Sequence, residues 1–101
     1  MKSDGFLSDV QLKKEIWRHI EKGSYRLSKH AADEQAQDDI DLCDTVHVLK
    51  TGKHNKNKTL FNNKFQVWNY AIEGSTEELK EVRVIVVFSH EMLIITVMEL
   101  K

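Results

Sequence analysis

The sequence has a single cysteine, Cys43, so no internal disulfide can form within its 101 residues. It has no apolar run near the roughly 18 residues that a membrane-spanning helix needs. Residues 1–9 lack the apolar stretch of a secretory signal, which argues against export. These absences predict a cytoplasmic protein that is not held in a membrane, and a reducing compartment suits the lone thiol.

The sequence also lacks the short motifs that mark several classes of enzyme. It contains no glycine-rich phosphate-binding loop and no serine-nucleophile motif. Cys43 and His47 are four residues apart, a spacing that can bind a metal, but no second pair of ligands lies nearby in the sequence. His30 and Glu34 have the same spacing without forming an H-E-x-x-H pattern. We therefore expect neither a metal site nor a cofactor.

The overall composition is typical of one small folded domain. Hydrophobic residues make up 41% of the chain and charged residues 31%, which are ordinary values for a globular protein. A chain of this length supports one modest core. No linker, repeat or low-complexity tract interrupts it, so we expect a single domain over residues 1–101.

Charge is unevenly placed along the chain. Residues 33–44 hold six acidic side chains and no basic one, whereas residues 50–64 hold five lysines, one histidine and no acid. The formal net charge is only -1, which argues against strong nonspecific binding to nucleic acid. The basic segment permits a localised contact with an anionic polymer, and a solvated hairpin is the alternative.

The first half of the chain predicts three helices, over residues 7–21, 29–37 and about 40–51. Ser8 and Ser28 are suited to cap the first two helices. The third begins at Asp39 or Asp41 and ends before Gly52. The residues of the third helix that we expect to face the core are Ile40, Cys43, Val46 and Leu49.

The second half changes to the alternating pattern of strands. Residues 59–61 and 64–72 predict a hairpin that turns at Asn62-Asn63. Residues 82–88 and 92–98 are apolar, β-branched runs joined by a tight turn. We therefore expect an α+β fold, with the N-terminal helices packed on one face of a C-terminal antiparallel sheet.

The segment SKHAADEQAQDDIDLCDTVHVLKTGK resembles the opening of a family in the RelE-like superfamily. That family pairs a His-Ala dipeptide with helices, an isoleucine and a glycine, which match His30-Ala31, Ile40 and Gly52 here. The C-terminal half, VWNYAI followed by VRVIVVFSHEMLIITVMELK, is similar to MqsR-type toxins, which are small ribonucleases of toxin–antitoxin pairs. The resemblance extends from about residue 7 to the end. It implies a RelE-like fold, cleavage of mRNA and an antitoxin partner.

Two positions depart from these patterns. Asp38 stands where the His-Ala family usually has an arginine, and Met98 stands where MqsR-type toxins carry a basic residue. Both departures remove a cation that phosphate chemistry would use, so a fold without catalysis stays open as an alternative.

Cleavage of the RelE kind needs no metal, because the 2′-hydroxyl of RNA attacks the adjacent phosphate while protein groups move protons and stabilise charge. Histidine suits proton transfer and arginine suits the phosphate. His30 and Arg83 are therefore the first catalytic candidates, and Lys53, His54 and Lys58 complete the set. The alternative is that His30 bonds a nearby backbone group and that Arg83 extends its stem to water.

A second set of residues is suited to hold single-stranded RNA. Lys50, Lys56 and Lys64 can follow its backbone, while Trp68 or Tyr70 can stack on a base. The two aromatics share a strand face with apolar residues, so packing in the core is their alternative role.

These observations support two hypotheses. The first is an endoribonuclease toxin that acts on single-stranded mRNA, free or on the ribosome, and that an antitoxin inhibits. The second is a non-catalytic binding module of the same fold, which holds RNA or an acidic protein partner through its lysines.

Overall fold

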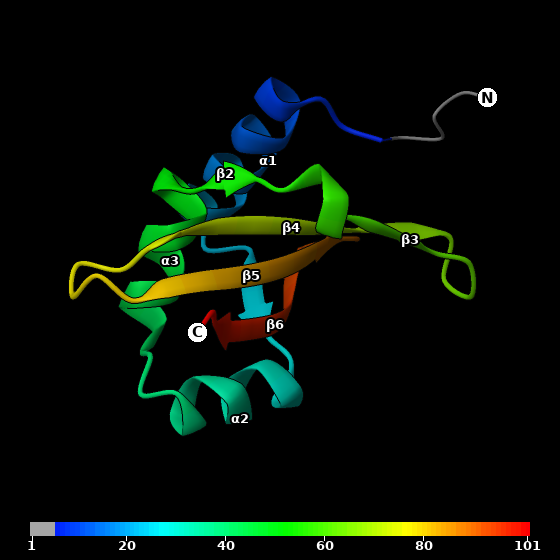
Figure 1. The fold of residues 1–101 in the computed structure, drawn as a ribbon. Helices are drawn as coiled ribbons and strands as arrows, with labels where there is room; N and C mark the ends of the chain where they lie inside the picture. Colours follow the sequence, from blue (N-terminus) through cyan, green and yellow to red (C-terminus); the bar gives the residue numbers. More distant parts are fainter. Residues whose placement is uncertain (1–5) are drawn as a thin grey trace.

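A computed structural model describes residues 6–101 of the chain, and residues 1–5 of the predicted domain lie outside the described part (Figure 1). The elements follow one another as α1 Asp9–Lys22, β1 Tyr25–Leu27, α2 Lys29–Gln37, α3 Leu42–Thr51, β2 Lys53–His54, the 3-10 turn η1 Lys56–Lys58, β3 Leu60–Asn62, β4 Val67–Ser75, β5 Glu81–Phe88 and β6 Met92–Glu99. Within residues 6–101, no helix combines the length and the apolar character needed to cross a membrane.

The six strands form one sheet in the order β1-β6-β5-β4-β2, with β3 also paired to β4. The predicted α+β class, with helices first and strands after them, is confirmed. The sheet is mixed rather than wholly antiparallel, because β1 pairs in parallel with β6. This three-residue strand is too short to show an alternating pattern in the sequence.

Side-chain caps set the first residues of α1 and α3. The Ser8 hydroxyl accepts from the Gln11 amide, and the Gln11 side chain accepts from the Ser8 amide, which makes a complete capping box. Asp41 and Asp44 form the same arrangement at α3, so this helix begins at Leu42 rather than at residue 40.

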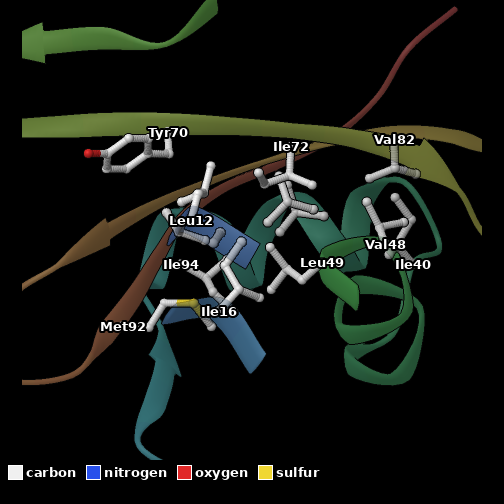
Figure 2. Close-up of a cluster of buried hydrophobic side chains, with 14 residues drawn as sticks. Leu12, Ile16, Ile40, Val48, Leu49, Tyr70, Ile72, Val82, Met92 and Ile94 are labelled. Carbon is white, nitrogen blue, oxygen red and sulfur yellow. The ribbon is translucent and has the colours of Figure 1, made fainter. Parts of the chain in front are cut away.

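One hydrophobic core lies between the sheet and the helices α1 and α3, as Figure 2 shows for its buried side chains. Leu12 and Ile16 of α1 meet strand residues such as Ile72 there. Of the residues predicted to face the core, Ile40 and Leu49 are buried and Val46 is half-buried, but Cys43 is exposed. The buried face of α3 consists of Thr45, Val48 and Leu49, which are spaced three and four residues apart.

Helix α2 lies along β6, at the edge of the sheet that β1 leaves uncovered. The amide of Val97 donates to Glu34 Oε1 at 2.9 Å, and the amide of Glu99 donates to Asp38 Oδ2 at 3.0 Å. Two carboxylates therefore satisfy backbone groups that have no strand beside them. Asp38 stands where the His-Ala family usually has an arginine, and here its side chain accepts the hydrogen bond from the Glu99 amide.

The end of α3 passes very close to β4. A Cβ atom at Gly52 would stand 2.6 Å from both the Glu73 and the Val48 carbonyl oxygens, and one at Gly74 would stand 2.9 Å from the Gly52 Cα atom. Lys13 of α1 stabilises the same point, because its ammonium donates to the Gly52 carbonyl oxygen at 2.8 Å. Only glycine lets the two backbones approach this closely.

We therefore predict that Gly52→Ala lowers the free energy of unfolding by about 1–3 kcal/mol, the usual cost of forcing an extra methyl group into a packed site. Chemical denaturation measures this change. The neighbouring Thr51→Ala, at an exposed position, is the control and should change stability by about 0.5 kcal/mol or less. Equal stability of the Gly52→Ala protein and the parent would contradict the close approach.

Candidate functional site

A row of charged side chains crosses the face of the sheet opposite α1 and α3. The strand register places Lys53 of β2 beside Glu73 of β4, and Glu73 beside Arg83 of β5. Arg83 Nε donates to Glu73 Oε2 at 2.6 Å, and Arg83 Nη1 lies 3.9 Å from Met98 Sδ. The candidate Arg83 is therefore ion-paired, and its side chain is only 18% exposed.

Glu73 is the carboxylate at the centre of this row. Asn55 Nδ2 donates to its Oε2 atom at 2.9 Å, on the side away from β5. Burial raises the pKa of Glu73, but the hydrogen bonds from Arg83 and Asn55 outweigh that effect and hold the pKa below its usual value. The positive charge of Lys58 lowers it further. Glu73 is therefore an ionised group surrounded by cations at neutral pH.

A shallow depression of about 570 Å³ lies beside this carboxylate, at the edge formed by β2 and η1. Its lining residues are Asp9, Lys53, His54, Asn55, Lys56, Asn57 and Glu73. The exposed Lys53 and Lys56 of the basic segment thus lie at this depression together with Glu73, and their charge suits a phosphate group.

His54 lies on the other side of β2 and is held at both ring nitrogens. Nδ1 is 2.9 Å from Asp9 Oδ1, and Nε2 is 2.8 Å from Thr59 Oγ1. The Thr59 hydroxyl that contacts Nε2 is itself held by the Asn55 carbonyl oxygen at 3.0 Å and by the Ala71 amide at 3.1 Å. The hydrogen bond from His54 holds the pKa of Asp9 below its usual value. The His54 side chain is 3% exposed, so it ties α1 to the edge of the sheet.

With this geometry in view, comparison with protein families gives one match. Residues 27–99 match the family model described as a domain of unknown function, DUF4258. The chain belongs to this family. No curated protein and no solved structure matches the chain. The match spans β1 to β6, so Glu73, Arg83 and the basic segment all lie within the DUF4258 domain.

His30 of the DUF4258 domain stands apart from the charged row. It lies on α2, its side chain is 69% exposed, and its Nε2 atom is 3.3 Å from Glu34 Oε2. In the sheet, β6 separates β5, and with it Arg83, from α2. Of the five catalytic candidates, Lys53, Lys58 and Arg83 therefore lie near Glu73, while His54 lies on the other side of β2 and His30 lies outside the row.

The candidate RNA-binding residues also divide between surfaces. Lys56 borders the depression, 3.8 Å from Asp9. Lys50 places its ammonium over the Trp17 ring on the helical side. Lys64 lies at the tip of the β3–β4 hairpin, which Figure 1 shows extending from the sheet.

The two aromatic candidates of the DUF4258 domain face the helices. Tyr70 is buried in the core, and its hydroxyl accepts from the Leu7 amide. Trp68 packs edge-on against Phe6 and Phe61. Both positions agree with the alternative role given for these aromatics in the sequence analysis, which was packing in the core.

Sequence reasoning missed Glu73, Asn55 and Asp9 as members of the site. Of these three residues, Glu73 has the clearest sequence signal, because it is a charged residue in an apolar strand, directly after the buried Ile72. Its pairing with Arg83 depends on the strand register, which no local pattern reveals. Among the described residues, no group of three His, Cys, Asp or Glu side chains is arranged to hold a metal ion.

The lowered pKa of Glu73 predicts a pH-dependent contribution to stability. A depressed carboxyl pKa stabilises the fold above the ordinary value of 4.5, and this contribution disappears as the pH falls through the folded-state pKa. We expect Glu73→Gln to lower the free energy of unfolding at pH 7 by about 0.5–1 kcal/mol, as for a partly exposed ion pair. The difference from the parent should shrink as the pH falls below 4.5 and vanish once the pH is below the folded-state pKa of Glu73.

Urea denaturation at pH 7 and in acid measures both values. Glu78→Gln is the matched control, because Glu78 is exposed in the β4–β5 loop. A Glu73→Gln effect that is the same at both pH values would show that the carboxylate charge is not what stabilises this row.

Proposed function

We propose that this protein is a metal-independent endoribonuclease of the RelE-like toxin type that acts on single-stranded RNA. The observation that carries the proposal is the meeting of Lys53, Lys58 and Arg83 around the Glu73 carboxylate. These cations come from β2, η1 and β5, and they are the residue types that phosphate chemistry requires. Their convergence on one carboxylate gives the elements of general acid–base catalysis with electrostatic stabilisation.

In the proposed reaction, the Glu73 carboxylate removes the proton of the 2′-hydroxyl, and the resulting oxygen attacks the adjacent phosphorus. Arg83 and Lys53 stabilise the negative charge that develops on the phosphate oxygens. The Lys58 ammonium gives a proton to the leaving 5′-oxygen as the P–O bond breaks. The products are a 2′,3′-cyclic phosphate and a 5′-hydroxyl, and the two transferred protons balance.

This arrangement changes the roles considered from the sequence. His30 has no part in the reaction, because it lies on the other side of β6. His54 acts as a positioning residue, since its two hydrogen bonds hold β2 and thereby Lys53 in place.

A binding module without catalysis is the second candidate, and one observation favours it. The Arg83–Glu73 contact of 2.6 Å already pairs these two charges, so a phosphate must share the guanidinium with Glu73. A carboxylate with a lowered pKa is also a weaker base. In that case the lysines would hold RNA or an acidic protein, with Glu73 fixing Arg83.

The biological setting belongs to the same proposal. The toxin resemblance implies a cytoplasmic partner, an antitoxin, whose acidic groups would cover the edge formed by β2 and η1. Production of the protein without that partner should then arrest bacterial growth and lower total mRNA.

The proposal predicts different effects for different variants. Glu73→Gln should lower cleavage of a single-stranded RNA by about 10²–10⁴-fold, the usual size of a proton-transfer contribution, without weakening RNA binding. Arg83→Lys should also impair cleavage, because lysine keeps the charge but lacks the planar fork.

Lys53→Gln with Lys58→Gln should weaken binding and lower the slope of log affinity against log salt by about 0.7 for each phosphate that the variant no longer neutralises.

Cleavage is followed on RNA with and without ribosomes, beside thermal unfolding of each variant. The control is Lys22→Gln with Lys29→Gln, which removes equal charge from exposed helical positions, and His30→Ala should stay fully active. Charge-dependent binding with no cleavage by the parent would reject catalysis and leave the binding module. Binding that is insensitive to Lys53 and Lys58 would reject both candidates.

A further inference from the structure

A second depression lies on the same open face of the sheet, at the end next to the β3–β4 hairpin. Its volume is about 440 Å³. Apolar side chains line most of it, among them Val67, Val87, Leu93 and Ile95, with Phe65 and Asn69 also in the wall. These strand residues alternate with core residues such as Val86 and Ile94, so the depression lies on the face away from α1 and α3.

Asn69 gives this depression its chemical character. Its Oδ1 atom is buried and has no hydrogen-bond partner among the described residues. An unpaired buried acceptor is uncommon in folded proteins and calls for an explanation, because it has given up water without gaining a donor. Asn69 also lines the depression, so a ligand with an N–H group would supply the missing donor once a rotation of the amide turns Oδ1 toward it.

A nucleobase fits these features. Its flat apolar faces match the aliphatic wall, and Phe65, which is 66% exposed at the hairpin, offers a ring for stacking. The exocyclic amino group of adenine can donate to Asn69 Oδ1, while Asn69 Nδ2 donates to an adenine ring nitrogen. This is the bidentate pairing by which asparagine selects adenine.

The depression also lies within reach of the charged row. Asn69 is four residues from Glu73 on β4, and Val87 is four residues from Arg83 on β5. At about 3.3 Å per residue, the two places are about 13 Å apart along the strands. A short piece of single-stranded RNA can therefore hold a phosphate beside Arg83 and place a nearby base beside Asn69.

We propose that this depression is a base-binding subsite that selects adenine at one position near the phosphate bound by Arg83 and Lys53. The inference rests on the proposed function, since it names the RNA sequence that the charged row would receive. An apolar side chain from a partner protein fits the aliphatic wall less well, because it would cover Asn69 Oδ1 without giving it a donor.

The test uses 2′-O-methyl oligonucleotides, which bind without being cleaved. Heptamers of uridine carry one adenosine at each position in turn, and their affinities are measured at one fixed low salt concentration. We expect one position to favour adenosine over uridine by about 5- to 150-fold, the range for a bidentate amide–base contact. Replacing that adenine by purine, which lacks the amino group, should remove most of the preference.

Asn69→Ala should make adenine and purine bind equally at that position, and its effect should not add to the effect of the purine replacement. Asn63→Ala is the matched control, because Asn63 is an exposed asparagine of the same hairpin outside the depression. Phe65→Ala changes an exposed residue and provides a second, well-folded variant. It should lower affinity by about 5- to 150-fold if the ring stacks on a base.

The outcomes separate this inference from the proposed function. RNA binding that depends on Lys53 and Lys58 but is the same for every base and for Asn69→Ala overturns the subsite and keeps the charged row. A complete lack of RNA binding overturns both. If Asn69→Ala and Phe65→Ala both leave the adenosine preference unchanged, another part of the protein selects the base, and the proposed subsite is wrong.

Discussion

The backbone contact between Gly52 and Gly74 is the constraint on which the site depends. Because the end of α3 meets β4 there without an intervening side chain, the next residue, Lys53, enters the sheet directly beside Glu73. A bulkier residue at Gly52 would push β2 away from β4 and break this register. The capping of α3 by Lys13 holds the same junction from the side of α1. The position of the lysines therefore follows from a packing requirement in the scaffold.

The two charged segments of the chain have different uses in the fold. Acidic residues of the segment 33–44 are drawn into backbone contacts: Asp41 caps α3, while Glu34 and Asp38 accept amides of β6. Lysines of the basic segment stay exposed around β2 and η1. The near-zero net charge is thus compatible with a localised positive surface, because many of the balancing acids lie along another edge.

Local sequence patterns predicted the parts of the fold that local physics decides. Helix caps such as Ser8 and Asp41 and the alternation of 82–88 and 92–98 marked elements that the structure contains. The strands β1 and β2 escaped prediction because two or three residues show no period. The cationic members of the site were recognisable by residue type. Glu73 was not recognisable, because its importance comes from the register of β4 against β5, which the whole sheet decides.

The carboxylates of α2 have a consequence for how this sheet meets other chains. The outer half of β6 would otherwise offer free amides on which another extended chain could add, as edge strands do in aggregation. Glu34 and Asp38 occupy two of these amides, so an incoming strand must displace both charged groups before it can pair. The protein thereby discourages polymerisation along β6 without a proline or a covering strand. Neutralising these acids would remove a barrier to self-association even if the fold itself survived.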